Sequence, residues 1–438
     1  MEVVIMVAQL LLGLSLLVGL HEMGHMVAAK AFGMRVEKFS IGFPPKIWGK
    51  KFGETEYSIG ALPLGGFVKI TGMIDESLDK ESLKSEPQPW EFRSKPAWQR
   101  LIVMLGGIIV NVITGIIVFI FIMFFFGKPY IAKDDVNQHG IYVNELGEKL
   151  GLKRGDKIIA INGQDFDNFT SASDIDLLLE DNSSYTIIRN NQEQVVPIPS
   201  DFLNDLSKDE REEPFLGYLM PFKVGKVTKN SPADSAGLQK GDEILMAANN
   251  RIKYFQDFRS LLNDNKGKSI PLVVQRGSEK VNLDVNVTEK GRLGFAVESL
   301  IKSSRLEFTF VEAIGVGTVE AFSVISRQLK AFGKIFRGEV NASDSLSGPI
   351  GMAKIFGGSW QWERFWTITG MLSMVLAFMN LLPIPALDGG HVVFLTYEIV
   401  SGRAPSDKVL EKSQIVGMII LLALMAFAFG NDIYKLIF

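Results

Sequence analysis

The apolar run from Leu101 to Phe126 constrains the fold of this chain more than any other feature. The run reads LIVMLGGIIVNVITGIIVFIFIMFFF and contains no charged side chain. It is longer than the roughly 20 residues that a helix needs to cross a hydrocarbon layer of about 30 Å. We therefore predict a membrane-spanning helix here, and with it a membrane protein.

Further uncharged segments are also about long enough to cross a bilayer. These segments are Val3–Leu20, Phe365–Leu387 and Ser413–Asn431. The first is expected to be a retained span rather than a cleaved signal peptide, because Met1-Glu2 is not basic and no small-residue cleavage site precedes His21. The sequence thus predicts a multi-pass α-helical membrane protein with four transmembrane helices.

Basic residues set the expected orientation, because cytoplasmic loops are enriched in Lys and Arg. They gather between spans 1 and 2 and between spans 3 and 4, at Lys30, Arg35, Lys38, Lys50, Lys51, Arg93, Lys95, Arg100, Arg403, Lys408 and Lys412. We expect these two loops in the cytoplasm and both termini outside. The long stretch between spans 2 and 3 is then extracytoplasmic.

That long stretch contains an internal repeat. Asn144–Gly163 and Asn230–Asn249 align, and each contains Gly-Leu-x-x-Gly-Asp. Gly at these points permits a tight turn between a short helix and an apolar strand. The second copy resembles circularly permuted bacterial PDZ domains through Ser231-Pro232-Ala233, whereas the first has Leu146-Gly147 at that place. The sequence predicts two extracytoplasmic PDZ-like α+β domains.

The predicted division of the chain follows from the spans and the repeat. It comprises spans 1 and 2 (1–126), PDZ-like domain 1 (127–215), PDZ-like domain 2 (216–300), an amphipathic membrane-surface region (301–364), and spans 3 and 4 (365–438). The amphipathic region includes Phe308–Phe336, which we expect to lie along the outer membrane face. It is expected either to couple the PDZ-like domains to the membrane site or simply to pack as a helix.

A metal-binding pattern, HExxH, ends the first span as His21-Glu22-Met23-Gly24-His25. On a helix, positions four apart share one face, so both histidines can bind one zinc ion with Glu22 beside it. The chain has only four histidines and no cysteine, so chance is a poor explanation and thiolate ligands are excluded. Two interfacial histidines at a helix end are the alternative, but such groups at membrane depth are costly without a partner.

A catalytic zinc site takes three protein ligands and keeps one open position. The topology places His139 and Asp156 outside, whereas spans 1 and 3 both end on the cytoplasmic side. There, Asn380–His391 contains two prolines and two glycines that break the helix. Asp388 is the only acid in this break and is the favoured third ligand. His391 is a competitor, for which an interfacial or supporting role is the alternative.

These motifs together resemble a known family. HExxH in span 1, Asn-x-x-Pro-x-Pro-x-Leu-Asp-Gly in span 3 and the PDZ-like repeats are similar to the site-2 protease family of intramembrane zinc metalloproteases, especially its bacterial RseP-type members. The resemblance implies one zinc ion held by His21, His25 and Asp388. It further implies that Glu22 is the catalytic base and that Asn380 helps to hold substrate.

Other stretches match this family, and two depart from it. The matching stretches are Phe39–Phe43, Pro63–Lys69 and Leu346–Ile350. Gly42-Phe43-Pro44 stands where the family usually has Gly-Phe-Gly, which predicts a stiffer loop. Gly107–Asn111 keeps the family's Asn but lacks its Pro. Neither departure affects a predicted metal ligand.

The stretch Glu56–Lys69 is predicted to form a membrane-associated β-hairpin between basic segments. Its edge could pair with an extended substrate strand, so Gly65, Gly66 and Phe67 are candidate substrate-binding residues. The family resemblance supports a re-entrant β-loop at this place. A plain interfacial hairpin packed under the helices is the alternative.

The predicted function is hydrolysis of peptide bonds in single-span membrane proteins. The resemblance implies substrates of the anti-sigma factor type and remnant signal peptides, and a bacterial inner membrane location. The PDZ-like domains could bind peptide or act as a size filter. A non-proteolytic PDZ scaffold is the alternative function. A zinc transporter is disfavoured because spans 2 and 4 lack acidic residues that could bind metal. A net charge of −3 argues against binding of nucleic acid.

Overall fold

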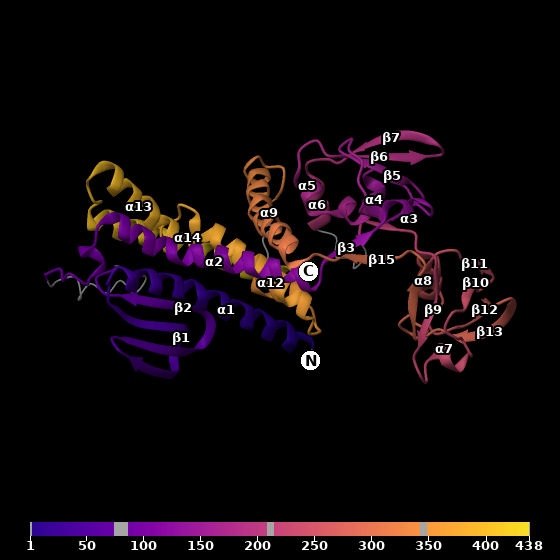
Figure 1. Ribbon diagram of the computed structural model, residues 1–438. Coiled ribbons are helices and arrows are strands. Elements are labelled where there is room, and N and C mark those ends of the chain that lie inside the picture. Colours follow the sequence, from indigo (N-terminus) through magenta and orange to yellow (C-terminus); the bar gives the residue numbers. More distant parts are fainter. Residues whose placement is uncertain (1, 74–85, 208–213, 342–347, 438) are drawn as a thin grey trace. The chain divides into compact units, whose positions relative to one another are not determined.

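The chain divides into two compact units in the computed structural model, which describes residues 2–73, 86–207, 214–341 and 348–437 (Figure 1). The first unit comprises Met1–Gly127 and Glu307–Phe438, and the second is Lys128–Leu306. The matched stretch Leu346–Ile350 lies partly outside the described residues.

Long helices dominate the first unit. They are α1 (Glu2–Ala31), α2 (Ala97–Phe125), α9 (Phe310–Phe336), α11 (Pro349–Phe356), α12 (Trp362–Leu381), α13 (Asp388–Ser401) and α14 (Asp407–Ile437), with a short 3-10 turn, η2 (Phe92–Ser94). Among the described residues, four are long and apolar enough to cross a membrane, namely α1, α2, α12 and the Lys408–Tyr434 part of α14. The four predicted spans are thereby confirmed as candidate membrane helices.

Small residues let the spans approach closely. Gly24 of α1 and Gly106 of α2 face each other, and a side chain on either would collide with the other's backbone. Gly115 of α2 similarly lies against Met374 of α12. Because lipid tails are as apolar as the helices, close packing rather than hydrophobic burial holds such spans together. Helix α2 is therefore the central span, flanked by α1 and α12.

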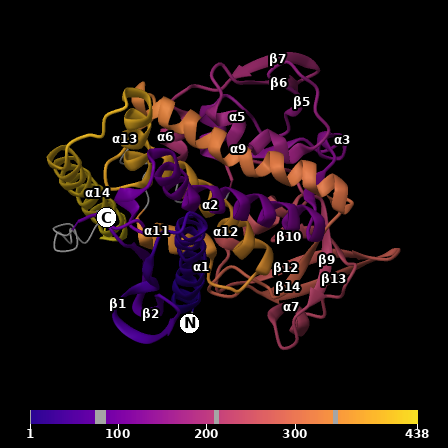
Figure 2. The ribbon, with the colours of Figure 1, turned by 60° about the vertical axis from the view of Figure 1, so that its left-hand side comes forward.

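Helix α9 packs across α2 and α12 (Figures 1 and 2). A Thr309 and Glu312 capping box begins the helix. Its buried Ala321 and Val324 join a cluster with Phe119 of α2. Farther along, the Phe332 ring lies 5.8 Å from the ring of Phe378 on α12. Helix α9 thus packs against two spans, and its depth in the membrane stays a prediction.

The hairpin next to α1 is larger than the sequence predicted. Strand β1 (Val36–Phe52) and strand β2 (Thr55–Ile70) pair antiparallel, and Ile41 pairs with both Ile59 and Gly66. The predicted hairpin Glu56–Lys69 is therefore one bent strand, whose two halves flank the first half of β1. The turn of the hairpin lies at Gly53. The bend was not visible in the sequence because it depends on close backbone contact between Gly60 and Gly42.

The second unit contains two successive α+β parts with separate cores. The first part contains α3 (Lys133–Asn137), β4 (Ile141–Val143), α4 (Glu145–Lys149), β5 (Lys157–Ile161), η3 (Phe169–Ser173), α5 (Ile175–Leu179), β6 (Ser184–Arg189), β7 (Gln192–Pro197), α6 (Phe202–Ser207) and β8 (Leu216–Tyr218). The second contains β9 (Phe222–Val227), α7 (Pro232–Ser235), β10 (Glu243–Ala247), β11 (Asn250–Arg251), α8 (Phe255–Asp264), β12 (Ser269–Arg276), β13 (Glu279–Asn286) and β14 (Phe295–Ser299). Strand β3 (Lys128–Ile131) pairs with β15 (Ser303–Leu306), so the two ends of the unit lie side by side.

The repeated Gly-Asp is built alike in both parts. Arg189 pairs with Asp156 at 2.5 Å, and Arg276 pairs with Asp242 at 2.7 Å. Each arginine also donates to the carbonyl of the first glycine of the repeat, at 2.7 Å for Arg189 and 2.8 Å for Arg276. The short helices α4 and α7 are capped in the same way, by Asn144 and Ser231. The assignment of these parts as PDZ domains stays a prediction.

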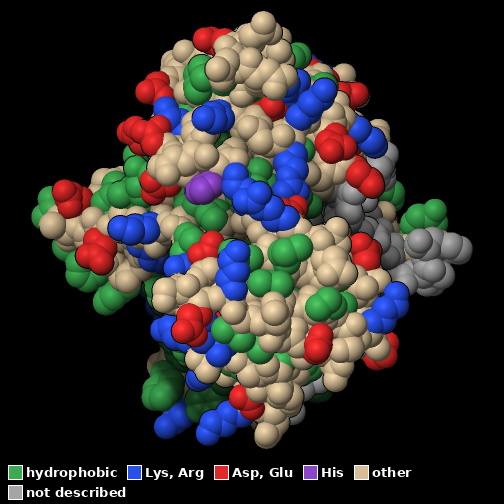
Figure 3. All heavy atoms as spheres, turned by 90° about the vertical axis from the view of Figure 1, so that its right-hand side faces the viewer, with side chains coloured by type: hydrophobic (Ala, Val, Ile, Leu, Met, Phe, Trp, Pro, Cys, Tyr) green, Lys and Arg blue, Asp and Glu red, His purple; other side chains and the backbone are tan. Residues whose placement is uncertain are grey.

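The space-filling view shows a mixed surface. Figure 3 shows Lys and Arg side chains interspersed with Asp and Glu side chains, with small hydrophobic patches between them. Mixed charge of this kind is typical of a solvated protein face, whereas nucleic-acid binders usually concentrate basic residues on one face.

Candidate metal centre

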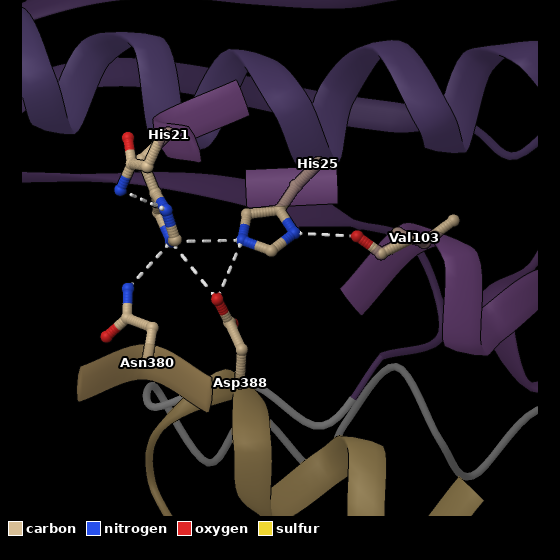
Figure 4. A network of polar contacts seen from close by, with 6 residues as sticks. His21, His25, Val103, Asn380 and Asp388 are labelled. Atoms are coloured by element: carbon tan, nitrogen blue, oxygen red, sulfur yellow. Dashed lines mark hydrogen bonds and ion pairs between the residues drawn. The ribbon is translucent and has the colours of Figure 1, made fainter. Parts of the chain in front are cut away.

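Helix α1 carries the HExxH pattern without interruption. Its length, Glu2–Ala31, extends past the predicted span and places His21 and His25 one turn apart on a single face. Both histidines are buried, and their Nε2 atoms lie 3.2 Å apart (Figure 4). The pair therefore points to one common position beside the helix.

Asp388 reaches this position from the other half of the chain. Helix α12 ends at Leu381, an irregular segment follows, and Asp388 is the first residue of α13. The turn is tight, because a side chain on Gly389 or Gly390 would collide with the backbone that precedes Asp388. The Oδ2 atom of Asp388 lies 3.2 Å from His21 Nε2 and 3.3 Å from His25 Nε2 (Figure 4).

The three atoms fit a tetrahedral zinc site. Their separations of 3.2, 3.2 and 3.3 Å form a nearly equilateral triangle. Zinc bonds of about 2.0–2.2 Å at tetrahedral angles give ligand separations of about 3.3 Å. Two imidazoles and one carboxylate are also a donor set typical of catalytic zinc. Three such ligands leave the fourth corner of the tetrahedron open.

Helix α2 supports the two histidines from behind. The Nδ1 atom of His25 lies 2.7 Å from the Val103 carbonyl oxygen, and Nδ1 of His21 lies 3.2 Å from Asn111 Nδ2. Gly107 lies between these two contacts, and a Cβ there would lie 2.5 Å from His21 Cε1 and from His25 Nε2. The imidazole rings thus lie against the bare backbone at Gly107.

Sequence reasoning missed this supporting surface. The sequence identifies Asn111 only as a family match and indicates no role for Val103 or Gly107. Their spacing of four along α2 matches the spacing of the histidines on α1, and this was the one signal that could have found them. It becomes informative only once α1 and α2 are known to pack together.

Asn380 lies beside the candidate ligands. Its side chain, near the end of α12, places Nδ2 3.3 Å from His21 Nε2 (Figure 4). His391 follows Asp388 by one turn of α13. Among the described residues, the side chains close enough together to hold a metal ion are those of His21, His25 and Asp388. The structure therefore brings Asp388, and not His391, to the two histidines. His139 lies in the other unit, where its ring contacts Tyr254.

Strand β2 runs along α1 at the catalytic-base candidate. A Cβ on Gly66 would lie 3.1 Å from Val18 Cγ1 and 3.5 Å from Glu22 Cγ. Gly65 lies against the ring of Phe43, and the ring of Phe67 has Lys38 Nζ 5.3 Å from its centre. Of the three substrate-binding residues predicted in the hairpin, Gly66 is therefore the one that the structure brings next to Glu22.

Comparison with known proteins places this arrangement in a family. The profile of peptidase family M50 matches residues 9–424. The chain belongs to peptidase family M50. Similar proteins include the regulator of sigma E protease of Haemophilus influenzae, at 32% identity over 97% of this chain and 98% of that one. The regulator of sigma-E protease RseP of Escherichia coli is 28% identical, covering 98% of each chain.

A further relative is named for its chemistry. A protein of Neisseria meningitidis that is named as a zinc metalloprotease is 29% identical, covering 96% of this chain and 97% of that one. Family and relatives confirm the predicted enzyme class, a zinc metalloprotease, and the predicted resemblance to RseP-type site-2 proteases. The four apolar helices make this M50 peptidase a membrane protein.

Proposed function

We propose that the protein hydrolyses peptide bonds in or near the transmembrane segments of single-span membrane proteins. In this proposal His21, His25 and Asp388 hold one zinc ion. The observation that carries it is the triangle of ligand atoms, with sides of 3.2–3.3 Å, whose two histidines lie on α1, a helix apolar enough to span a membrane. A metal site on a membrane-spanning helix would act on a chain that is itself in the membrane.

Glu22 acts as the general base of this reaction. His21, His25 and Asp388 would hold a zinc ion that, when bound, would polarise the scissile carbonyl as a Lewis acid and lower the pKa of water toward about 7. Glu22 follows His21 directly on α1, removes the proton of the attacking water and delivers it to the leaving amine nitrogen. Asn380, whose amide faces the ligand atoms, holds the substrate backbone by hydrogen bonding.

Strand β2 presents the substrate. A transmembrane helix hides its carbonyl groups in internal hydrogen bonds, so it must unwind before attack. Gly66 lies beside Glu22, and the β2 segment that begins there pairs with β1 on one side. A substrate added to this sheet as an extended strand would bring its carbonyl groups to the metal centre. The glycine backbone permits this close approach.

The relatives support a proposal for the substrates and the location. Relatives that carry the name regulator of sigma-E protease support a membrane-bound anti-sigma factor as substrate. The resemblance to RseP-type proteases adds remnant signal peptides as a second proposed class. The proposed location is the bacterial inner membrane, with the active site toward the cytoplasm. Both termini and the two PDZ-like domains would lie outside, where those domains bind peptides or restrict the size of entering substrates.

The alternative function is a non-proteolytic scaffold with PDZ domains. The Glu22→Gln variant separates the two functions, because it removes the base and leaves every proposed ligand in place. Zinc content and cleavage of a single-span reporter are measured in detergent for the native protein and the variant. We expect zinc in both proteins and cleavage by the native protein alone. Zinc in both without cleavage by either would favour the scaffold.

A further inference from the structure

We propose that Asn111 is a positioning residue that fixes the tautomer of His21. In this role its side-chain carbonyl oxygen accepts a hydrogen bond from His21 Nδ1–H, so that Nε2 keeps its lone pair for the metal ion. The inference rests on the proposed metal site. It assigns a function to a buried side chain of α2 that is not itself a ligand.

Two side-chain amides contact the imidazole ring of His21, one at each ring nitrogen. Asn111 Nδ2 lies 3.2 Å from His21 Nδ1, and Asn380 Nδ2 lies 3.3 Å from His21 Nε2. A neutral imidazole has one donor nitrogen and one acceptor nitrogen, so it cannot accept hydrogen bonds from both amides. One of the two amides must therefore present its oxygen to the ring. The choice of amide decides which ring nitrogen can bind metal.

The ligand triangle identifies Asn111 as that amide. The Nε2 atom of His21 faces Asp388 Oδ2 and His25 Nε2, so a proton on Nε2 would point into the triangle and prevent metal binding. The proton must reside on Nδ1, which then needs an acceptor. Asn111 is the side chain that contacts Nδ1, and its oxygen and nitrogen exchange places by rotation about the Cβ–Cγ bond.

Among the described residues, no hydrogen bond to Oδ1 holds the Asn111 amide with its nitrogen toward His21. The residue is fully buried, and its Oδ1 has no hydrogen-bond partner among the described residues. Rotation of the amide therefore breaks no hydrogen bond made by Oδ1. The neighbouring Ser373 donates to the backbone carbonyl of Asn111 at 2.8 Å, and this contact does not involve the side-chain amide.

His25 also has a hydrogen-bond acceptor next to its Nδ1 atom, and here the acceptor is a backbone carbonyl. Its Nδ1 lies 2.7 Å from the Val103 carbonyl oxygen, which can only accept, so Nδ1 carries the proton and Nε2 is the available ligand. Val103 and Asn111 flank Gly107 by four residues on each side of it along α2. One helix thus gives each histidine an acceptor for its Nδ1 proton, the usual companion of an imidazole ligand.

The test compares Asn111→Leu, Asn111→Asp and the control Ser373→Ala in the full chain. Zinc affinity is measured by chelator competition in detergent, and the site geometry by visible absorption of the Co²⁺-loaded protein. We expect Asn111→Leu to bind zinc about 10–100-fold more weakly than the native protein. Asn111→Asp should stay close to native affinity with a native-like Co²⁺ spectrum, because a carboxylate can accept but cannot donate. Ser373→Ala should match the native protein.

Two results would overturn the inference while leaving the metal site intact. The first is a native zinc affinity in Asn111→Leu. The second is a loss of zinc affinity in Asn111→Asp as large as that in Asn111→Leu, because such a loss would indicate that Asn111 donates a hydrogen bond or has a purely structural role. If Asn111→Leu does not fold, the comparison of Asn111→Asp with the native protein decides. Failure of the native protein to bind zinc would instead refute the proposed metal site, and the inference with it.

Discussion

The Gly107→Ala substitution tests whether the histidines depend on the bare backbone of α2. The added Cβ would lie 2.5 Å from His21 Cε1 and from His25 Nε2, about 1 Å closer than carbon atoms normally approach. The rings must therefore move by about 1 Å, whereas metal–ligand distances tolerate about 0.2 Å. A displacement of this size costs about 100-fold in rate.

The fold itself should survive this substitution. Overpacking costs about 1–3 kcal/mol, while replacing Gly by Ala within a helix recovers about 1 kcal/mol. Gly115→Ala is the matched control, because it adds the same methyl group to the same helix against the flexible Met374 side chain, far from the histidines.

The assay measures zinc content and the initial rate of reporter cleavage at equal amounts of folded protein. We expect Gly107→Ala to lose zinc affinity and about 100-fold in rate, and Gly115→Ala to remain within a few fold of the native protein. Equal zinc affinity and equal rates in the two variants would refute the packing argument.

Three further outcomes are expected. Removal of metal with a chelator should abolish cleavage, and added zinc should restore it; cleavage that persists without metal would contradict the zinc mechanism. Asp432 of α14 accepts hydrogen bonds from the backbone amides of Gly348, Ile350 and Gly351 at 2.9, 2.8 and 3.2 Å. Asp432→Asn should therefore destabilise the junction of α11 and α14 by about 2 kcal/mol and lower the unfolding midpoint in detergent. An unchanged midpoint would count against this role of Asp432. Burial raises the pKa of Asp242, but hydrogen bonds from Arg276 and the Gln239 amide outweigh it and hold this pKa below its ordinary value. Stability from this pair is therefore present above about pH 4 and lost as pH falls through the lower native pKa. Hydrogen exchange of residues 222–299 in the full chain should show this loss on acidification and a smaller loss in Arg276→Met, and identical acid profiles would contradict it.

Local spacing made part of the site predictable from sequence. His21 and His25 are four residues apart, so one helix fixes their relation before any tertiary contact forms. Asp388 was predictable as the third ligand from the membrane topology. The helix break that contains it and the end of span 1 are both expected on the cytoplasmic side. The spans were predictable because lack of charge over a sufficient length is a property of the segment alone.

The remainder of the site depends on contacts between distant segments. Asn111 and Gly107 contact the histidines only because α1 and α2 pack against each other. The sequence pattern of either helix alone does not specify this packing. The bend of β2 was missed for a similar reason, because the contact of Gly60 with Gly42 joins two strands. Asp432 likewise sits in an apolar helix, and its partners are the amides of α11.

The metal assignment is tested by the zinc content of the native protein, Asp388→Ala and His391→Ala. The two altered residues lie one turn apart on α13, so the second variant controls for local disturbance. We expect about one zinc ion per chain in the native protein and in His391→Ala, and loss of zinc in Asp388→Ala. Retention of zinc by Asp388→Ala together with its loss from His391→Ala would contradict the metal assignment.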